Sequence, residues 1–267
     1  MNFLELELPF ETPRGIELPF SDGYGVPHAN NYIPFLSASS VSLATRSAFS
    51  GVKIRRIHQA LSGNEARAIH HMNFSPYVLD IREQYPTYLQ EDYNRYKLAG
   101  TRMPRNKVMT YDIVLTMVLP DSIHGGYRLS YHGISIKDAE HVLSEADENR
   151  QIREHARFAD RGWTWEFLRG DAFPKRAYGN HLLLKTWIDR PDIWPLYDIA
   201  KALAQRLKAR SMRGTMDDVL SRHARHMGIA LDDLYEIFAI SVSFGFTRID
   251  HSHELRVDKP LMLEVGS

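Results

Sequence analysis

The chain has 267 residues, with 33 Lys and Arg balanced by 33 Asp and Glu, and it contains no cysteine. The lack of cysteine excludes disulfides, thiolate zinc sites and cysteine nucleophiles, and it suits a reducing cytosol. No apolar run approaches the roughly 20 residues that cross a bilayer, and the acidic N-terminus is unlike a signal peptide. A stand-alone DNA-binding protein usually carries excess positive charge, so zero net charge favours a chain that a partner delivers to its substrate.

The first part of the chain alternates between irregular and regular segments. Residues 1–36 are rich in proline, glycine and aromatic side chains, which predicts an extended arm. Residues 41–58 are strand-like, and a helix is expected from 65 to about 73, where apolar residues recur at helical spacing. A short strand is expected over 77–81. The polar and basic stretch 86–107 is typical of a long surface loop.

Two long strands follow, over 109–119 and 127–137, and a loop rich in proline and glycine joins them as a hairpin. A helix is expected over 139–160 and a further strand over 163–168. This order of elements predicts a mixed sheet flanked by helices, an α/β or α+β core, which we place over residues 37–190.

The pattern changes near residue 190. Three helices are expected after it, and two short strands that would form a β-hairpin follow the last helix. Helices followed by a hairpin are typical of a winged helix, so we expect an α-rich winged-helix domain over residues 191–267. The segments are 193–210, 216–227 and 231–244 for the helices, and 246–249 and 255–263 for the strands.

Two charged residues interrupt strands that otherwise look buried. Asp112 lies in the first strand of the hairpin and Lys137 ends the second. A charge in an apolar layer is costly unless something compensates it. Because alternate residues of a strand share a face, Ser135 and Lys137 can meet Asp112 at one end of the sheet. Glu65, on the preceding helix, can add a second carboxylate from the side.

This set of residues predicts a metal-dependent nuclease. The carboxylates of Glu65 and Asp112, with the backbone carbonyl of Ile136, are hard oxygen ligands that suit Mg²⁺, or Mn²⁺. Lys137 can orient an attacking water or stabilise charge on the phosphorane. The alternative is an Asp–Lys pair at a sheet edge with no catalytic role, because short patterns of this kind often arise by chance.

A stretch at residues 78–86, VLDIREQYP, resembles the VLDIREQ-aromatic-proline signature of the TnsA family, the restriction-endonuclease-like subunits of heteromeric transposases. Further matches occur in the same order at NYIPFL (31–36), SGNE (62–65), TYDIV (110–114) and ISIK (134–137). The resemblance spans roughly residues 30–190, with a looser match in the C-terminal part. The signature near residue 80 is specific, whereas the catalytic residues alone are not.

The resemblance implies a restriction-endonuclease-like fold and an endonuclease that cuts the 5′ ends of a transposon in a bacterial cytoplasm. It implies that Glu65, Asp112 and Lys137 are catalytic and that Mg²⁺ is bound. The chain departs from the family at Ser135, where the pattern has Gln or Glu. The implied partners are double-stranded DNA at transposon ends, a TnsB-like DD(E/D) transposase subunit that cuts the 3′ side, and a TnsC-like ATPase regulator.

Two other functions remain open. A serine at position 135 is compatible with a DNA-binding and scaffolding subunit whose nuclease site has decayed. A stand-alone restriction or repair nuclease of similar fold is the other, and the neutral charge argues against it. A scaffold would remain necessary for assembly even with Asp112 mutated, whereas an enzyme with that mutation would lose excision while assembly stays intact.

Several further residues attract attention. Glu83 and Gln84 are expected to be structural or close to DNA at a strand end. Histidine pairs suggest zinc only weakly, because no third ligand converges on them: His223 with His226, and His251 with His253. Basic residues are expected to contact DNA phosphates at five positions, Lys53, Arg55, Arg56, Arg222 and Arg225.

Overall fold

The computed structural model describes residues 1–37, 46–209 and 213–264. At its centre is a four-stranded sheet in the order β3-β4-β5-β6, in which β6 runs parallel to β5 and the other neighbours are antiparallel. A separate two-stranded sheet pairs β1 with β2. The strands are β1 (Ser47–Ser50), β2 (Ile57–Ala60), β3 (Val78–Thr87), β4 (Met109–Pro120), β5 (Tyr127–Lys137) and β6 (Thr164–Arg169).

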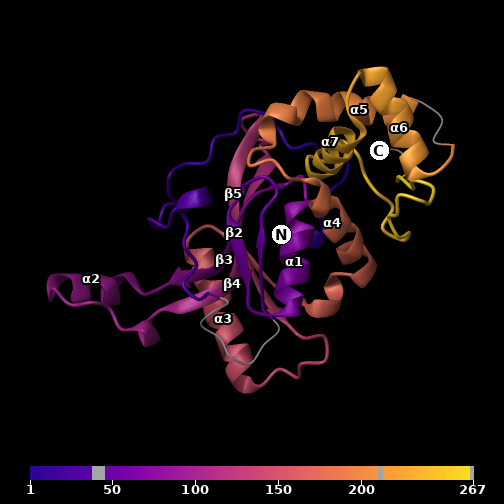
Figure 1. The fold of residues 1–267 in the computed structure, drawn as a ribbon. Coiled ribbons are helices and arrows are strands. Elements are labelled where there is room, and N and C mark those ends of the chain that lie inside the picture. Colours follow the sequence, from indigo (N-terminus) through magenta and orange to yellow (C-terminus); the bar gives the residue numbers. More distant parts are fainter. Residues whose placement is uncertain (38–45, 210–212, 265–267) are drawn as a thin grey trace.

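Helices cover both faces of the sheet (Figure 1). Ile113 and Leu115 of β4 pack in the same core as α1, whereas Val114 points to the other face and packs with Phe158 of α3. The mixed sheet flanked by helices that the sequence predicts is therefore confirmed. The helices are α1 (Gly63–Asn73), α2 (Gln90–Leu98), α3 (Glu145–Asp160), α4 (Lys175–Trp187), α5 (Tyr197–Ala209), α6 (Met216–Met227) and α7 (Leu231–Ser243).

Some element boundaries differ from the sequence prediction. β3 continues to Thr87 and does not stop at residue 81. The helix expected from 139 begins at Glu145, because Ser144 and Asp147 form a capping box that fixes the start there. Helix α4 has no counterpart in the prediction. The expected strand-like segment 41–58 contains β1 and the start of β2, and its residues 41–45 lie outside the described ranges.

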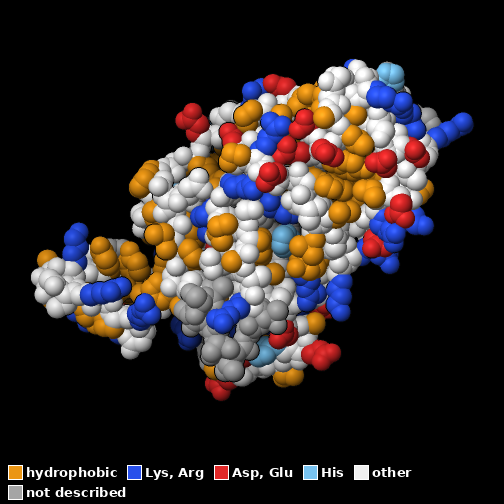
Figure 2. Space-filling view, viewed as in Figure 1, with side chains coloured by type: hydrophobic (Ala, Val, Ile, Leu, Met, Phe, Trp, Pro, Cys, Tyr) orange, Lys and Arg blue, Asp and Glu red, His pale blue; other side chains and the backbone are white. Residues whose placement is uncertain are grey.

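The prediction of a surface loop over residues 86–107 is wrong, because this stretch contains helix α2. This helix has acidic residues in its first turn and basic residues in its last, an order that the helix dipole favours. It projects from the body of the molecule between β3 and β4 (Figure 1). The face in view carries Lys, Arg and hydrophobic side chains on this projection (Figure 2).

Helix α3 approaches β5 closely at Gly133. A Cβ atom at this glycine would lie 2.2 Å from Phe158 of α3, so only glycine allows the contact. Phe158 is fully buried between Tyr111 and Trp163, with ring centroids 4.4 and 5.7 Å away. This contact sets how near the rest of α3, including the turn before Phe158, comes to the end of the sheet.

The N-terminal arm is extended, as expected, but it is packed along the body. Phe10 stacks on Tyr77 with ring centroids 3.9 Å apart. The N–H of Thr12 donates to the Phe244 carbonyl at 2.9 Å, and its hydroxyl donates to the Pro76 carbonyl at 2.6 Å. The arm therefore joins the sheet region to the C-terminal helices.

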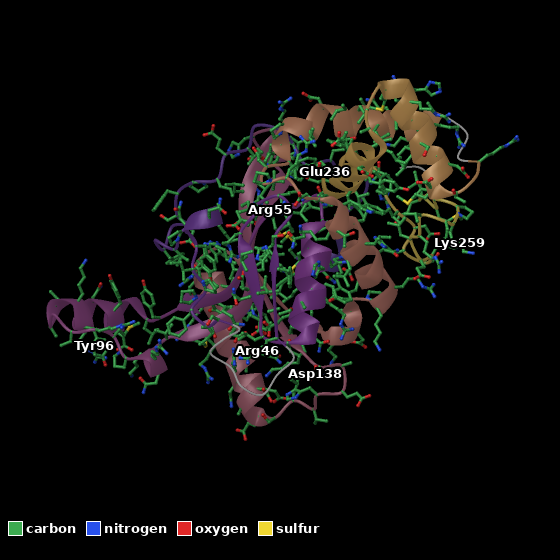
Figure 3. The ribbon with its side chains drawn as sticks, in the orientation of Figure 1. Arg46, Arg55, Tyr96, Asp138, Glu236 and Lys259 are labelled. Carbon is green, nitrogen blue, oxygen red and sulfur yellow. The ribbon has the colours of Figure 1, made fainter. Side chains whose placement is uncertain are left out.

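The expected domain boundary near residue 190 runs through a packed junction. The carboxylate of Glu236 accepts from the backbone N–H groups of Asp189 and Arg190 at 3.1 and 3.0 Å. Arg55 donates to the carbonyl of Arg190, and Figure 3 labels Arg55 and Glu236 on the two sides of this junction. Ile188 also packs in the core of the C-terminal helices.

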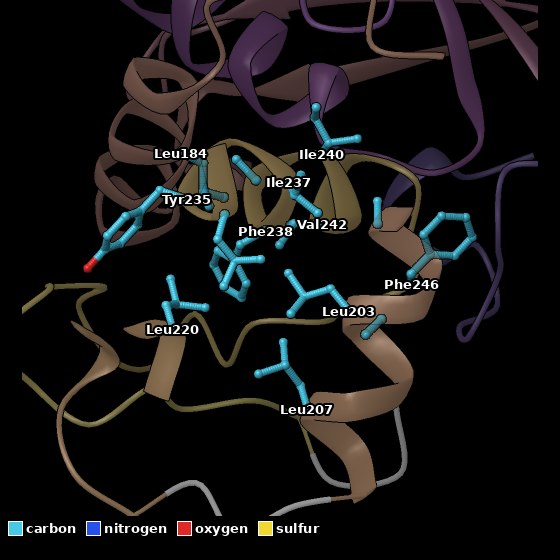
Figure 4. Packing of buried hydrophobic residues seen from close by; sticks show 14 of the residues in the cluster. Leu184, Leu203, Leu207, Leu220, Tyr235, Ile237, Phe238, Ile240, Val242 and Phe246 are labelled. Carbon is cyan, nitrogen blue, oxygen red and sulfur yellow. The ribbon is translucent and has the colours of Figure 1, made fainter. Parts of the chain in front are cut away.

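Three helices, α5, α6 and α7, form that C-terminal core around residues such as Leu203, Leu220 and Phe238 (Figure 4). Of the β-hairpin expected after them, the described residues keep one antiparallel bridge, between Ile249 and Leu263, with flanking backbone hydrogen bonds, but they form no regular strands there. The physical reason lies at the start of α6. Its first free N–H groups donate to carbonyls of residues 257 and 259 at 3.0 and 2.7 Å, so this segment caps a helix and does not pair as a strand.

No helix within the described ranges is both long and apolar enough to cross a bilayer.

Replacing Gly133 with Ala is expected to lower the free energy of unfolding by about 1–3 kcal/mol, because the new methyl group would overlap Phe158. Gly179→Ala in α4 is the control, since no atom lies within 4 Å of its built Cβ, and it should be neutral or stabilising by up to about 1 kcal/mol. Urea denaturation measures both. Equal stability of the two variants would mean that α3 does not lie against β5 as described.

Candidate active site

A polar pocket of about 330 Å³ opens at the end of the central sheet. Every catalytic or metal-binding residue expected from the sequence lines it. Glu65 comes from the start of α1, Asp112 from β4, and the segment Ser135–Lys137 from the end of β5. Three segments far apart in the sequence therefore contribute two acids and an ammonium to one cavity, which is the juxtaposition that the sequence predicts.

The pairing of β4 with β5 positions Asp112. Because Ile113 pairs with Ile134, Asp112 lies next to Ser135 across the two strands. One carboxylate oxygen of Asp112 accepts from the backbone N–H of Ile136 at 2.7 Å, which fixes its direction. Burial raises the pKa of Asp112, although this N–H and the charge of Arg150 act in the opposite direction. No donor among the described residues binds the other oxygen, which is open to a cation.

Glu65 lies in the first turn of α1, after the N-cap Ser62. Its carboxylate accepts from the backbone N–H of Leu61 at 3.0 Å, the hydroxyl of Ser62 at 3.2 Å and the amide of Gln84 at 3.4 Å. Burial, and then the negative charge of Asp112, raises the pKa of Glu65 to about 7. Near neutral pH the two carboxyl groups therefore resist being ionised together.

Lys137 reaches the pocket but is engaged. Its ammonium lies 3.4 Å from a carboxylate oxygen of Asp147, and about a third of its side chain is exposed. Asp147 also caps α3 through Ser144 and accepts from His141 at 3.1 Å. The hydrogen bonds from Ser144 and His141 and the contact with Lys137 lower the pKa of Asp147. Lys137 is thus held at the pocket wall by an acid that remains charged.

The structure adds Glu154, which the sequence analysis missed. Its side chain is 1% exposed, accepts from the hydroxyl of Ser135 and binds Arg150 at 2.7 Å. It lies one turn before Phe158 on the same face of α3, so the contact at Gly133 brings it to the sheet. The sequence gives no clear signal for it, because α3 carries two bulky apolar residues, Ile152 and Phe158, and only Phe158 is packed.

The oxygen atoms that line this pocket suit a hard divalent cation. Carboxylate oxygens are the ligands that Mg²⁺ prefers, and the mutual repulsion of Glu65 and Asp112 is relieved when a cation lies between them. Among the described residues, the side chains are not already gathered into a group of three or more His, Asp or Glu ligands. The pocket offers two carboxylate ligands, Glu65 and Asp112, and Glu154 and the Ile136 backbone line the same pocket.

Two of the residues expected to contact DNA have other roles. Lys53 is 7% exposed and donates to the Ser75 carbonyl at 2.7 Å, and Arg56 is also 7% exposed and paired with Glu83. This burial does not fit contact with phosphate. Arg55 is engaged at the junction with Arg190. The expectation for the α6 residues stays a prediction: Arg225 is exposed, and Arg222 donates to a backbone carbonyl.

Glu83 is a structural residue, not an active-site acid. Its side chain is fully buried and accepts from Arg56 and His58. Although burial alone would raise the pKa of Glu83, these bonds lower it to about 2. Gln84, in contrast, contacts Glu65 and has a positive φ of 50°, a strained conformation within a strand beside the site.

The histidine pairs do not converge. His223 is buried and His226 is exposed on α6. His251 packs on His181 with ring centroids 4.7 Å apart, whereas His253 turns to Asp250 at 2.8 Å. The zinc interpretation therefore receives no support from these positions.

No protein-family model matches this chain, and no curated protein is significantly similar to it.

Glu65→Gln is expected to stabilise the metal-free protein at pH 7. Because the folded pKa of about 7 lies above the usual 4.5, the stability that Glu65 contributes is fully present below pH 4.5 and is lost as pH rises through 7. The gain at pH 7 should be up to about 3 kcal/mol, and the variant's unfolding free energy should vary less between pH 4.5 and 7. Urea denaturation across this pH range measures it.

Glu83→Gln is the matched control, since it also removes one buried carboxylate. It should destabilise the protein, by about 3–5 kcal/mol, because Arg56 then stays buried without its charge partner. If Glu65→Gln also destabilises at pH 7, the raised pKa of Glu65 is wrong.

Proposed function

We propose that this chain is a metal-dependent DNA endonuclease subunit of a heteromeric transposase, which cuts the 5′ side of each transposon end. The observation that carries the proposal is the shared pocket of Glu65, Asp112 and Lys137. A divalent cation would neutralise the two acids, which repel each other, and a phosphodiester would pair with the basic group beside them. The resemblance of residues 78–86 to the TnsA signature supports the transposase context.

The fold agrees with this proposal at the level of its layers. A mixed sheet with helices on both faces, and catalytic residues at one end of an antiparallel hairpin, is compatible with a restriction-endonuclease-like domain. The C-terminal helices α5–α7 would serve as the second, winged-helix-like unit, in a form whose described residues lack a paired wing. Exposed Arg225 on α6 remains a candidate for phosphate contact there.

Glu65 and Asp112, with the carbonyl of Ile136, would hold Mg²⁺ or Mn²⁺. The ion, when bound, supplies Lewis acidity and lowers the pKa of a coordinated water. The Ile136 N–H holds one oxygen of Asp112, which leaves the other directed to the pocket. Lys137 would donate to the attacking water or to a phosphate oxygen, and Arg150 lies in the same wall. Hydrolysis would leave a 3′-hydroxyl and a 5′-phosphate.

A DD(E/D) transposase subunit would select the transposon end and cut the 3′ side, and an ATPase would regulate the assembly. This division of labour agrees with the zero net charge of the chain, because end recognition would rest with the partner.

A DNA-binding scaffold with a weakened site is the second candidate. It is favoured by the serine at position 135 and by the internal pairing of both basic groups, Lys137 with Asp147 and Arg150 with Glu154. If the chain is a scaffold, removing a metal-binding residue should leave both assembly and cutting unchanged. If it is the enzyme, the same change should abolish cutting but leave assembly intact.

Asp112→Asn is expected to abolish Mg²⁺-dependent 5′ cutting, by about 10³-fold or more, because the cation loses a charged ligand. Asp121→Asn, at an exposed turn between β4 and β5, is the control and should cut normally. End-labelled transposon-end DNA, incubated with the partner transposase, measures cutting, and gel filtration measures assembly. Wild-type cutting by Asp112→Asn, or no Mg²⁺-dependent cutting by wild type, would leave the scaffold as the better reading.

Glu154→Gln is expected to raise the Mg²⁺ concentration for half-maximal cutting by about tenfold, the range seen for residues that support metal ligands. Ser135→Ala removes the hydroxyl that binds Glu154 but leaves the carboxylate, so it should change this concentration by less than about threefold. Titration of Mg²⁺ in the same cutting reaction compares them. Equal effects would mean that Glu154 acts only by anchoring Ser135.

A further inference from the structure

The projecting segment 88–108, called the α2 arm from here on, has no buried side chain among its described residues. Leu89 and Leu98 are 53% and 89% exposed, and helix α2 has no apolar face against the body. A helix that is polar all round and packs no face against its own chain leaves its surface open to solvent or to a partner. The arm is therefore accessible for binding.

A concave site of about 470 Å³ lies on this arm, a size typical of ligand sites. Its lining combines flat aromatic rings with cations. Tyr88 and Tyr93 stack on each other with ring centroids 5.1 Å apart, and Tyr96 lies toward the end of the projection (Figure 3). The cationic residues of the lining are Lys97, Arg102 and Arg105.

The charge of the arm points to an anionic occupant. The segment contains five Lys and Arg against two acids, a net charge of +3, in a chain whose total is zero. Asp92 is occupied by Arg95 and, at 3.9 Å, by Lys107. The three cations of the concave site form no ion pair with any carboxylate that the structure describes. They are available to bind phosphate.

The arm starts from the same end of the sheet as the candidate active site. At its base Thr87 pairs with Met109, three residues before Asp112 on β4. Arg150 of the pocket donates to the carbonyl of Thr110 at 3.0 Å, so the pocket wall touches the arm's base. The three-residue step from Met109 to Asp112 spans about 10 Å along β4. One strand of DNA covers that distance in about three nucleotides, at about 3.4 Å per nucleotide. The base of the arm therefore lies within a few nucleotides of Asp112.

We propose that the α2 arm binds the phosphodiester backbone of the DNA that flanks the cleaved bond. Lys97, Arg102 and Arg105 would contact successive phosphates, and the tyrosines would lie against sugars or exposed bases. The inference rests on the proposed function for the position of the cleaved bond, but not for the chemistry of the arm. An acidic peptide could also satisfy the cations, but the position of the arm's base beside the pocket proposed to hold the scissile phosphate favours DNA.

The test is DNA binding by the full chain, with Ca²⁺ in place of Mg²⁺ so that nothing is cut. Fluorescence anisotropy of labelled duplex and single-stranded DNA is recorded over a range of salt. The variant Lys97→Gln/Arg102→Gln/Arg105→Gln should bind duplex about tenfold or more weakly at about 0.1 M salt, and the slope of log K against log salt should fall by about 2–3. Tyr93→Ala/Tyr96→Ala should weaken binding with the slope unchanged. A larger tyrosine effect on single strands would assign the rings to exposed bases.

The matched control is Arg128→Gln/Lys175→Gln/Arg176→Gln, which removes one lysine and two arginines from exposed positions outside both the arm and the C-terminal helices. Lys175 and Arg176 begin α4, which lies on the opposite side of the molecule from α2 (Figure 1). The control should keep the wild-type slope. An equal loss in both triple variants, or displacement of DNA by polyglutamate of equal charge, would overturn the proposal, as would the absence of DNA binding by wild type at low salt.

Binding and cutting fail separately in this design. If the arm variant loses binding but wild type never cuts under any metal, the endonuclease proposal fails and the arm stands. If wild type cuts and the arm variant binds normally, only the arm proposal fails.

Discussion

The register in which β4 and β5 pair fixes the position of the charged groups at the end of the sheet. Ile113 opposite Ile134 places Asp112 beside Ser135 and lets the Ile136 N–H hold the aspartate. A slip of one residue would turn Asp112 to the opposite face of the sheet. Apolar side chains on both faces of β4 oppose such a slip, because they would have to exchange the α1 side for the α3 side. The fold thus specifies the site through its core.

The pocket then carries more negative charge than its own basic residues neutralise. The nearby cations are held by other acids, Lys137 by Asp147 and Arg150 by Glu154. Glu65 and Asp112 form no ion pair with any described residue, and burial together with the charge of Asp112 raises the pKa of Glu65 to about 7. Proteins commonly accept such destabilisation where they bind ligands. A divalent cation would remove the conflict, which links the stability of the pocket to the chemistry proposed for it.

Much of this arrangement could be predicted from the sequence, because period-two alternation and the helical spacing after Ser62 identify which residues share a face. Glu154 could not, since its place depends on how closely α3 packs at Gly133, a long-range contact. Lys53 and Arg56 look like surface cations in a linear pattern, yet partners distant in sequence bury them. Helix α2 was missed for the opposite reason: its side chains have no packed face, so it carries little hydrophobic periodicity.

The most direct test of the central claim is to locate a bound cation. Crystals of the full chain soaked in Mn²⁺ at pH 8, where Glu65 is ionised, would give anomalous scattering from the metal. The account predicts a peak within coordination distance of both the Glu65 and Asp112 carboxylates, and no such peak in Asp112→Asn crystals. A peak elsewhere with none at these two residues, or an unchanged peak in the variant, would contradict it.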